Sequence, residues 1–218
     1  MFVDSVAVDF FANDVVLVKV NSKVDTLLAE KYSVSAVPTF VLTDANGEEI
    51  DRIVGSDSTE AFLQTIRDYE NGIGTLDDLL HRAESETDRS LFFEIADKYK
   101  YRGGSDEAQT WYARVIDEGE PTDSLSAESR FSIADMFRRA KEYDRSHEEF
   151  GKIMSDFEGT MFAQDAEIYM AIINRQQGDT AAAIKAFEGY IKHYPESEDV
   201  EYANKQIEKL KNPDADEK

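Results

Sequence analysis

The sequence predicts an α/β segment followed by an α-helical solenoid. Up to about Gly72, short β-branched runs alternate with stretches whose apolar residues recur at helical spacing. Beyond Gly72 no strand-like run occurs, and amphipathic stretches follow one another across short turns containing Gly, Asp or Pro. With 218 residues, of which 41% are hydrophobic, the chain is long enough to bury a core in one large domain or two small ones.

The α/β segment is expected to hold three helices and three strands. The run "VVLVKV" at Val15–Val20 and the run "TFVLTD" at 39–44 are typical of buried strands. An Asn46-Gly47 turn leads from the second run into its returning partner, residues 48–55. The apolar pattern predicts helices over residues 3–14, 23–33 and 57–72, the last opened by a capping box from Asp57 to Glu60.

The helical part contains the same pattern of five positions three times. Successive positions are separated by 3, 9, 4 and 3 residues, and the first and third positions hold small residues while most of the others hold aromatic or apolar ones. The three sets are Ala96, Tyr99, Ala108, Tyr112 and Val115; Ala134, Phe137, Ser146, Phe150 and Ile153; and Ala171, Asn174, Ala183, Phe187 and Tyr190. A small residue on one helix lets the next helix approach closely, and an aromatic neighbour fills the groove between them. The pattern therefore predicts pairs of packed helices in tandem.

This region, from about Arg89 to Lys211, resembles the tetratricopeptide family. The units start 38 residues apart (Ala96 to Ala134) and 37 residues apart (Ala134 to Ala171), longer than the usual period of about 34. Asn174 also stands where an aromatic residue is usual. The ending "YIKHYPESEDVEYANKQIEKL" is similar to a longer-period subgroup of bacterial envelope assembly proteins, whose repeats end in Tyr-Pro-x-Ser.

Residues 2–79 resemble the C-terminal two thirds of a bacterial thioredoxin-like domain. The resemblance is carried by "VVLVKVN" and by "LAEKYSVSAVPTFVLTDANGEEIDRIVG", with Tyr-x-Val-x-x-x-Pro-Thr at its centre. It implies a cis peptide bond between Val37 and Pro38 and a loop, Val37, Pro38 and Thr39, that faces the substrate. In the family, the backbone of the residue before this proline hydrogen-bonds an extended peptide, which makes Val37 the expected binding residue.

The reactive half of such a domain is missing from the sequence. The chain has no cysteine, and the family's Cys-x-x-Cys segment would precede Met1. We therefore expect no catalytic residue, no thiol chemistry and no cofactor in the chain as given. The family's central strand would be lost as well, which exposes the inner edges of two strands. Four outcomes are open: the strands close up, another chain supplies the missing strand (a homodimer through these edges included), this half is poorly ordered, or the true start lies upstream.

The repeats offer a candidate binding groove. Basic residues stand four positions beyond each repeat alanine, at Lys100, Arg138 and Arg175, with Arg139 beside the second. In tetratricopeptide arrays this position resembles one that lines the concave groove, where cations can hold an acidic segment or a C-terminal carboxylate. Phe93 and Phe131 would add apolar contacts. The alternative is that these cations only interact favourably with the C-terminal dipoles of their helices.

Charge and composition exclude several other functions. A formal charge of -22 disfavours nucleic-acid and anionic membrane partners, because their phosphates are repelled. His81, His147 and His193 lack the one-turn spacing of a metal-binding helix, so we expect surface residues and no metal site. The first residues lack the basic and apolar regions of a signal peptide, which predicts a cytoplasmic protein as written, or a periplasmic or envelope protein if the true start lies upstream.

The predicted organisation is a truncated thioredoxin-like domain over 1–72, a connecting helix over 73–88, about three helical repeats over 89–211 and an acidic tail over 212–218. The expected function is non-catalytic binding of protein or extended peptide partners. The alternative is a fragment, or a chain with a misplaced start, of a thiol-disulfide oxidoreductase whose Cys-x-x-Cys lies upstream. A third interpretation is a pure envelope-assembly scaffold.

Overall fold

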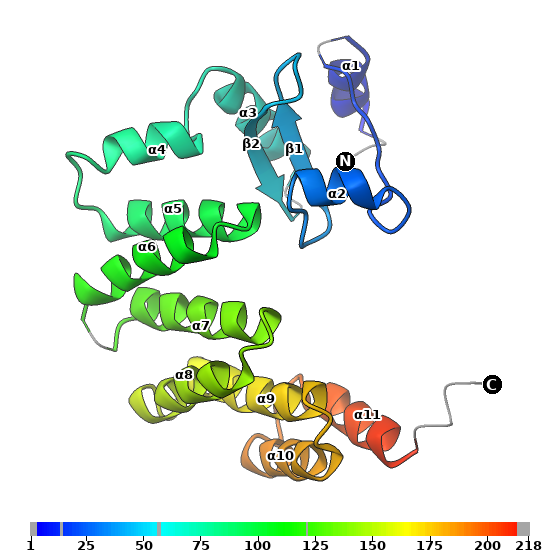
Figure 1. The fold of residues 1–218 in the computed structure, drawn as a ribbon, viewed down its shortest axis with the longest axis vertical. Helices are drawn as coiled ribbons and strands as arrows, with labels where there is room; N and C mark the ends of the chain where they lie inside the picture. Colours follow the sequence, from blue (N-terminus) through cyan, green and yellow to red (C-terminus); the bar gives the residue numbers. More distant parts are fainter. Residues whose placement is uncertain (1–3, 14, 56–57, 121, 213–218) are drawn as a thin grey trace. The chain divides into compact units, whose positions relative to one another are not determined.

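The computed structural model describes residues 4–13, 15–55, 58–120 and 122–212 (Figure 1). The chain divides into two compact units, Met1–Trp111 and Tyr112–Lys218. The first unit holds a small sheet and the helices around it, and the second holds helices, as the α/β plus all-α fold class predicts. The division falls within helix α6 (Ser105–Asp117), so part of the predicted repeat region belongs to the first unit.

The sheet of the first unit is an antiparallel pair of strands. Strand β1 (Thr39–Thr43) pairs with β2 (Glu49–Val54) in a register that sets Thr39 opposite Val54 and Phe40 opposite Ile53, with an irregularity beside Leu42 and Thr43. The turn between the strands is closed by the Asp44 carboxylate, which accepts hydrogen bonds from the backbone N–H of Asn46 (2.8 Å) and Glu48 (2.9 Å). The Asn46-Gly47 turn of the sequence analysis is therefore present.

Three helices surround this hairpin. Side chains of α1 (Ser5–Asn13) and α3 (Thr59–Glu70) form a core cluster of Phe10, Phe62, Leu63 and Ile66, against which Phe11, Val15, Phe40, Leu42 and Ile53 pack. The rings of Phe40 and Phe62 meet edge to face at 4.6 Å between centroids. The short α2 (Thr26–Lys31) is tied to the hairpin turn, because the Tyr32 hydroxyl at its end donates to the Gly47 carbonyl at 2.9 Å.

One expectation about this unit is wrong. Residues 15–20 do not form a buried strand: they have no regular secondary structure, and their side chains are largely exposed, Val16 at 93% and Val18 at 70%. The run is β-prone, but in the part of the chain that the structure describes no strand lies beside it to pair with it. Helix α3 is capped by Ser58, whose hydroxyl accepts from the Ala61 N–H at 3.2 Å; the predicted capping box from Asp57 to Glu60 includes Asp57, which lies outside the described residues.

Two further helices complete the first unit before the division. Helix α4 (Leu76–Arg82) is capped by the Thr75 hydroxyl, and α5 (Arg89–Arg102) by the Asp88 carboxylate. Helix α5 ends at Gly103, whose left-handed φ of 82° turns the chain into α6. In the core of this part, Phe92 packs against Trp111 at 5.6 Å between ring centroids.

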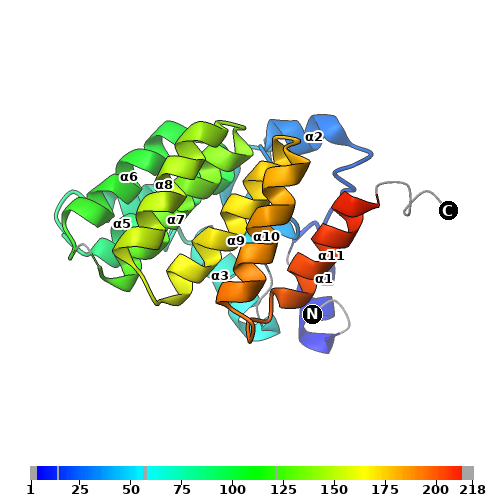
Figure 2. The ribbon, with the colours of Figure 1, turned by 90° about the horizontal axis from the view of Figure 1, so that it is seen from below.

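The second unit is an array in which each helix packs against the next, as Figures 1 and 2 show. Its helices are α7 (Ser124–Arg139), α8 (Tyr143–Asp156), α9 (Met161–Gln176), α10 (Thr180–His193) and α11 (Val200–Lys211). Of the fifteen repeat positions predicted from spacing, all except Tyr99 and Asn174 are buried. The predicted tandem helix pairs are thus present, and the small residues lie inside them.

The repeat ending also has a structural role. The buried Tyr190 hydroxyl lies 2.8 Å from the Ser197 hydroxyl, and the Gln164 amide donates to both, at 3.1 and 2.8 Å. Ser197 belongs to the Tyr-Pro-x-Ser ending, so this ending fixes the connection between α10 and α11 to α9.

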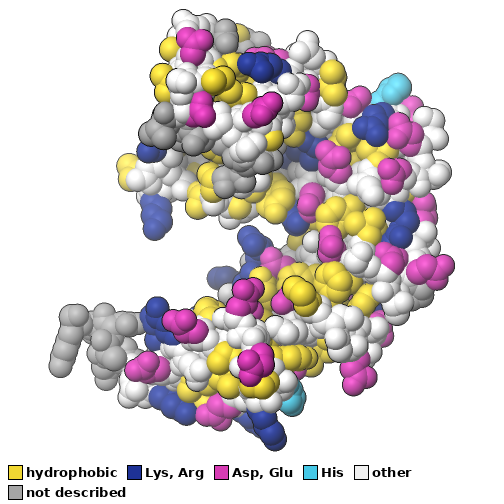
Figure 3. Space-filling model, turned by 180° about the vertical axis from the view of Figure 1, so that it is seen from behind, with side chains coloured by type: hydrophobic (Ala, Val, Ile, Leu, Met, Phe, Trp, Pro, Cys, Tyr) yellow, Lys and Arg dark blue, Asp and Glu magenta, His cyan; other side chains and the backbone are white. Residues whose placement is uncertain are grey.

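The surface is strongly acidic, and carboxylate side chains are scattered over both units on the face shown in Figure 3. None of the helices in the described ranges is both long and apolar enough to cross a membrane.

Candidate functional site

The loop before β1 exposes a backbone segment. The Val37–Pro38 peptide bond is cis, and Val37 is 78% exposed. Two hydrogen bonds hold the loop on either side: the Thr39 hydroxyl donates to the Ala36 carbonyl at 2.7 Å, and the Gly55 N–H donates to the Pro38 carbonyl at 2.9 Å. Among the described residues, no backbone group of Val37 bonds to another backbone group. Val37, Pro38 and Thr39 are therefore contiguous, held in place and accessible.

In the second unit, three of the predicted groove residues lie close together. Arg138 and Arg139 share the Asp135 carboxylate, with contacts of 2.7 and 2.6 Å to its two oxygens. The Arg138 guanidinium also lies over the Tyr169 ring, 5.5 Å from its centroid. The Phe131 ring packs edge to face against the Tyr169 ring, with 4.9 Å between centroids. Phe131 is half-buried against the core that joins α7 to α9.

These contacts set the electrostatics of the cluster. Two guanidinium groups therefore share the Asp135 carboxylate, and the Arg138 guanidinium lies beside the Tyr169 ring. Burial and the Asp135 carboxylate raise the pKa of the Tyr169 phenol above its ordinary value, with the two arginines opposing them, so the ring is neutral at physiological pH. Arg138 and Arg139 can bind an anionic group of a ligand while they remain paired with Asp135.

Arg175, the equivalent cation of the next repeat, has no acidic partner among the described residues. Its guanidinium donates to the Gln206 amide oxygen of α11 at 2.5 Å. The repeat pattern explains the difference, because Asp97 and Asp135 follow their repeat alanines directly whereas Ile172 stands at that position in the third set. Arg175 is half-buried.

Phe93 and Lys100 belong to α5, in the first unit. Lys100 forms an ion pair with Asp97 at 2.5 Å and lies over the Tyr101 ring, and Phe93 is half-buried.

The histidines form no metal site. His81 is exposed, and His193 is exposed and bonded to Glu167 at 2.8 Å. His147 departs from the expected surface position: it is half-buried, and its Nε2 lies 3.1 Å from the Asn174 amide oxygen. Asn174, the residue that departs from the repeat pattern, thus provides a polar partner between α8 and α9. No group of residues suitable for a metal ion occurs in the described part of the chain.

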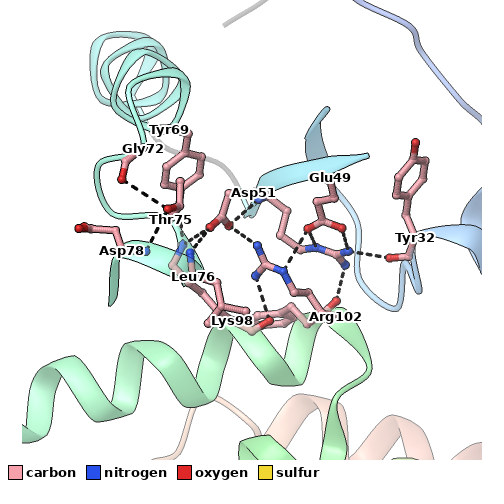
Figure 4. A network of polar contacts seen from close by, with 12 residues as sticks. Tyr32, Glu49, Asp51, Tyr69, Gly72, Thr75, Leu76, Asp78, Lys98 and Arg102 are labelled. Atoms are coloured by element: carbon pink, nitrogen blue, oxygen red, sulfur yellow. Dashed lines mark hydrogen bonds and ion pairs between the residues drawn. The ribbon is translucent and has the colours of Figure 1, made fainter. Parts of the chain in front are cut away.

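A buried ionic network in the first unit was not anticipated (Figure 4). Asp51 of β2 is fully buried and accepts hydrogen bonds from Lys98 and from the Leu76 N–H, at 3.1 and 2.7 Å. Arg102 pairs with the other Asp51 oxygen at 2.7 Å and with Glu49 at 3.3 Å. The network therefore joins the sheet to the start of α4 and to the inner face of α5.

A second arginine extends this network. Arg52 pairs with Glu49 at 2.5 Å, donates to the Tyr32 carbonyl at 2.8 Å and also donates to the Tyr101 carbonyl. The sequence carries one signal of the network. Asp51 stands two residues before Ile53, so the two side chains lie on the same face of the strand. An apolar side chain on an inward face needs no polar partner, whereas a buried carboxylate does. The identity of those partners could not be read from the sequence, since Lys98 is 47 residues away.

Comparisons with known proteins agree with both resemblances. Residues 3–70 match the model of a thioredoxin-like domain, and residues 165–197 match the model of a tetratricopeptide repeat. The second match covers most of α9, all of α10 and the Tyr-Pro-x-Ser ending. No curated protein matches the chain. The chain therefore contains a thioredoxin-like domain followed by repeats of the tetratricopeptide type.

Proposed function

We propose that the protein is a non-catalytic interaction module that binds extended peptide segments of other proteins. Two surfaces serve this role: the Val37–Thr39 loop in the first unit, and the Arg138, Arg139 and Arg175 side chains in the second. The observation that supports the proposal most directly is Val37, which is exposed and whose backbone makes no hydrogen bond to another backbone group in the described ranges. Such a backbone can pair with an extended chain, and the absence of cysteine leaves no thiolate to react with it.

The second surface supports an acidic peptide or a C-terminal carboxylate as ligand. Arg175 carries a charge that no carboxylate among the described residues neutralises, and Arg138 and Arg139 place two guanidinium groups around the Asp135 carboxylate. Arginine donates paired hydrogen bonds in a plane, the geometry that carboxylates require. The acidic remainder of the chain limits non-specific binding of other acidic proteins, so capture depends on these few cations.

Charge reversal tests the second surface. We expect Arg138→Glu and Arg175→Glu to weaken binding of a synthetic acidic peptide with a free C-terminus at least about tenfold, or roughly 1.4 kcal/mol. Lys185→Glu, at an exposed position of α10, changes the net charge equally and provides the control. Circular dichroism would verify that each variant stays helical. Unchanged peptide affinity in both arginine variants would contradict the proposal for this surface.

The loop is tested separately by NMR spectroscopy of the whole chain. Titration with an extended peptide is expected to shift the backbone amide signals of Val37 and Thr39, and amides of α10, in the second unit, serve as the control. Binding that leaves the loop signals unchanged would remove the loop from the binding surface.

A further inference from the structure

We propose that Gln206 of α11 is the positioning residue of the main carboxylate-binding site in the second unit, where it orients the Arg175 guanidinium without neutralising its charge. The inference rests on the proposed function, because Arg175 is one of the cations assigned there to an acidic peptide. It adds the residue that makes Arg175 available to a ligand, and it ranks Arg175 above Arg138 and Arg139 as the contact to the ligand carboxylate.

The contact between Arg175 and Gln206 joins two helices of the second unit. Arg175 lies in the last turn of α9, and its Nη1 donates to Oε1 of Gln206 at 2.5 Å. Gln206 is only 8% exposed. The same two helices pack through a core cluster that contains Ile168 of α9 together with Ala203 and Ile207 of α11. The guanidinium is therefore bonded to a side chain that the packing of α11 holds in place.

The preceding repeat treats its equivalent cation differently. Arg138 pairs with Asp135, which stands three residues earlier on α7, at 2.7 Å. In the third set, Ile172 stands three residues before Arg175, so the helix supplies no carboxylate at that position. The amide of Gln206, from another helix, takes the place of the missing aspartate. Arg175 is thus held by a neutral partner where Arg138 is held by a charged one.

The choice of glutamine at this buried position matters for charge. Buried side-chain amides are uncommon, and they are kept where they have a hydrogen-bond partner. An amide oxygen accepts from a guanidinium but carries no net charge, whereas the carboxylate of a glutamate of the same shape would form an ion pair with Arg175. Gln206 therefore fixes the direction of the guanidinium and leaves its positive charge for a ligand.

An oriented guanidinium favours a carboxylate as its ligand. Among the residues that the structure describes, only Nη1 of Arg175 makes a hydrogen bond, to Gln206, so Nε and Nη2 can donate to the two oxygens of one carboxylate. A guanidinium that is already held in place also loses less rotamer freedom when the ligand binds. Arg175 is therefore expected to contribute more to the affinity for an acidic peptide than Arg138 does.

The test uses the whole chain and the same acidic peptide with a free C-terminus. Gln206→Glu keeps the shape of the side chain but neutralises Arg175, so it is expected to weaken peptide binding at least about tenfold. The free energy of unfolding, measured with urea, is expected not to fall, because the new carboxylate has a partner. Asn204→Asp adds the same charge at an exposed position of α11 and is expected to change the affinity less than about twofold.

Two further measurements separate orientation from charge. Gln206→Met keeps the size of the side chain and the charge of Arg175 but removes the acceptor, and it is expected to weaken binding about threefold, less than Gln206→Glu does. NMR spectroscopy of the unaltered chain needs no folded variant at position 206. The side-chain Nε–H signal of Arg175, assigned with Arg175→Lys, is expected to shift with added peptide more than that of Arg138.

The outcomes distinguish this inference from the proposed function. Unchanged affinity of Gln206→Glu, a loss of affinity that merely follows a loss of stability, or an Arg175 signal that stays constant while the peptide binds would overturn the role of Gln206. If Arg138→Glu still weakens binding in that case, the proposed function stands. Peptide binding that neither Arg138→Glu nor Arg175→Glu weakens would instead contradict the proposed surface itself.

Discussion

The Lys98 ammonium lies 3.1 Å from the Asp51 carboxylate, and both side chains are buried, at 8% and 0% exposure. The pair joins a strand of the thioredoxin-like domain to the helix that opens the first predicted repeat. Arg102, one turn further along α5, pairs with the other oxygen of the same carboxylate. Both side-chain cations that pair with Asp51 among the described residues lie on α5, so the contacts of the sheet extend beyond Gly72.

Removing the Asp51 charge is expected to destabilise the first unit strongly. Asp51→Asn keeps the shape of the side chain but leaves Lys98 and Arg102 buried with too little negative charge. Loss of one member of a buried ion pair costs about 3–5 kcal/mol of unfolding free energy. Urea denaturation, followed by the fluorescence of Trp111 in the same unit, measures the loss.

A second substitution separates charge from packing. Asp51→Asn combined with Lys98→Met is expected to recover part of the loss, since the unpaired ammonium is removed. Lys152→Met, at an exposed cation that pairs with Glu148 and Glu149, is expected to cost less than about 1 kcal/mol. A small effect of Asp51→Asn, similar to that of Lys152→Met, would show that the network contributes little.

The predicted small residues of the repeats are expected to tolerate no enlargement. Ala171 is fully buried in α9, so Ala171→Leu forces neighbouring helices apart and is expected to cost about 1–3 kcal/mol or more. Ala181→Leu, at an exposed position of α10, is the matched control and should change stability by less than about 0.5 kcal/mol. Thermal unfolding followed by circular dichroism compares the two. Equal midpoints would contradict the close packing at Ala171.

The serine of the Tyr-Pro-x-Ser ending is expected to stabilise the second unit. Ser197→Ala removes one partner of the buried Tyr190 hydroxyl, which retains Gln164, so the expected cost is about 1 kcal/mol. Ser155→Ala removes an exposed hydroxyl whose hydrogen bonds go to Lys152 and Asp156 of the same helix, α8. It should therefore change the free energy of unfolding little. Chemical denaturation measures the free energy of unfolding of both variants. Equal values for Ser197→Ala and Ser155→Ala would show that the Ser197 contacts do not stabilise the unit.

The sequence predicted those features that depend on local spacing. Repeat positions such as Ala134, Phe150 and Ala171 are buried as expected, because helical periodicity and residue size are local properties. The hairpin from Thr39 to Val54 was also predicted, since its turn chemistry lies within five residues of chain. Local pattern was therefore sufficient for the hairpin and for the burial of the repeat positions.

Features that depend on distant partners were missed. Val15–Val20 has the composition of a buried strand, but burial requires neighbouring strands that composition does not provide. The Asp51 network joins residues almost fifty positions apart, and the pairing of His147 with Asn174 links two repeats. One local pairing was also missed: Asp135 stands three and four residues before Arg138 and Arg139 on the same helix, a spacing at which side chains meet.

The stability of the second unit is expected to respond to pH through Asp165 of α9. Burial, and then the nearby carboxylates of Asp199 and Glu198, raise the pKa of Asp165 above its ordinary value because all three disfavour its ionised form. The folded chain therefore holds this proton more tightly than the unfolded chain. The stabilisation that this tighter proton binding adds to the free energy of unfolding is complete below the ordinary pKa of an aspartate, about 4. It is lost as the pH rises through the raised pKa of Asp165 in the folded chain.

Asp165→Asn removes this ionisation and tests the sign. We expect the variant to gain stability relative to the unaltered chain as the pH rises from about 4 to about 7, with the difference smallest at the acidic end. Glu208→Gln, which removes an exposed carboxylate of α11, controls for the change in net charge. Urea unfolding at the two pH values gives the comparison. A variant whose relative stability falls with rising pH would mean that the Asp165 carboxylate is stabilised in its ionised form, contrary to its surroundings in α9.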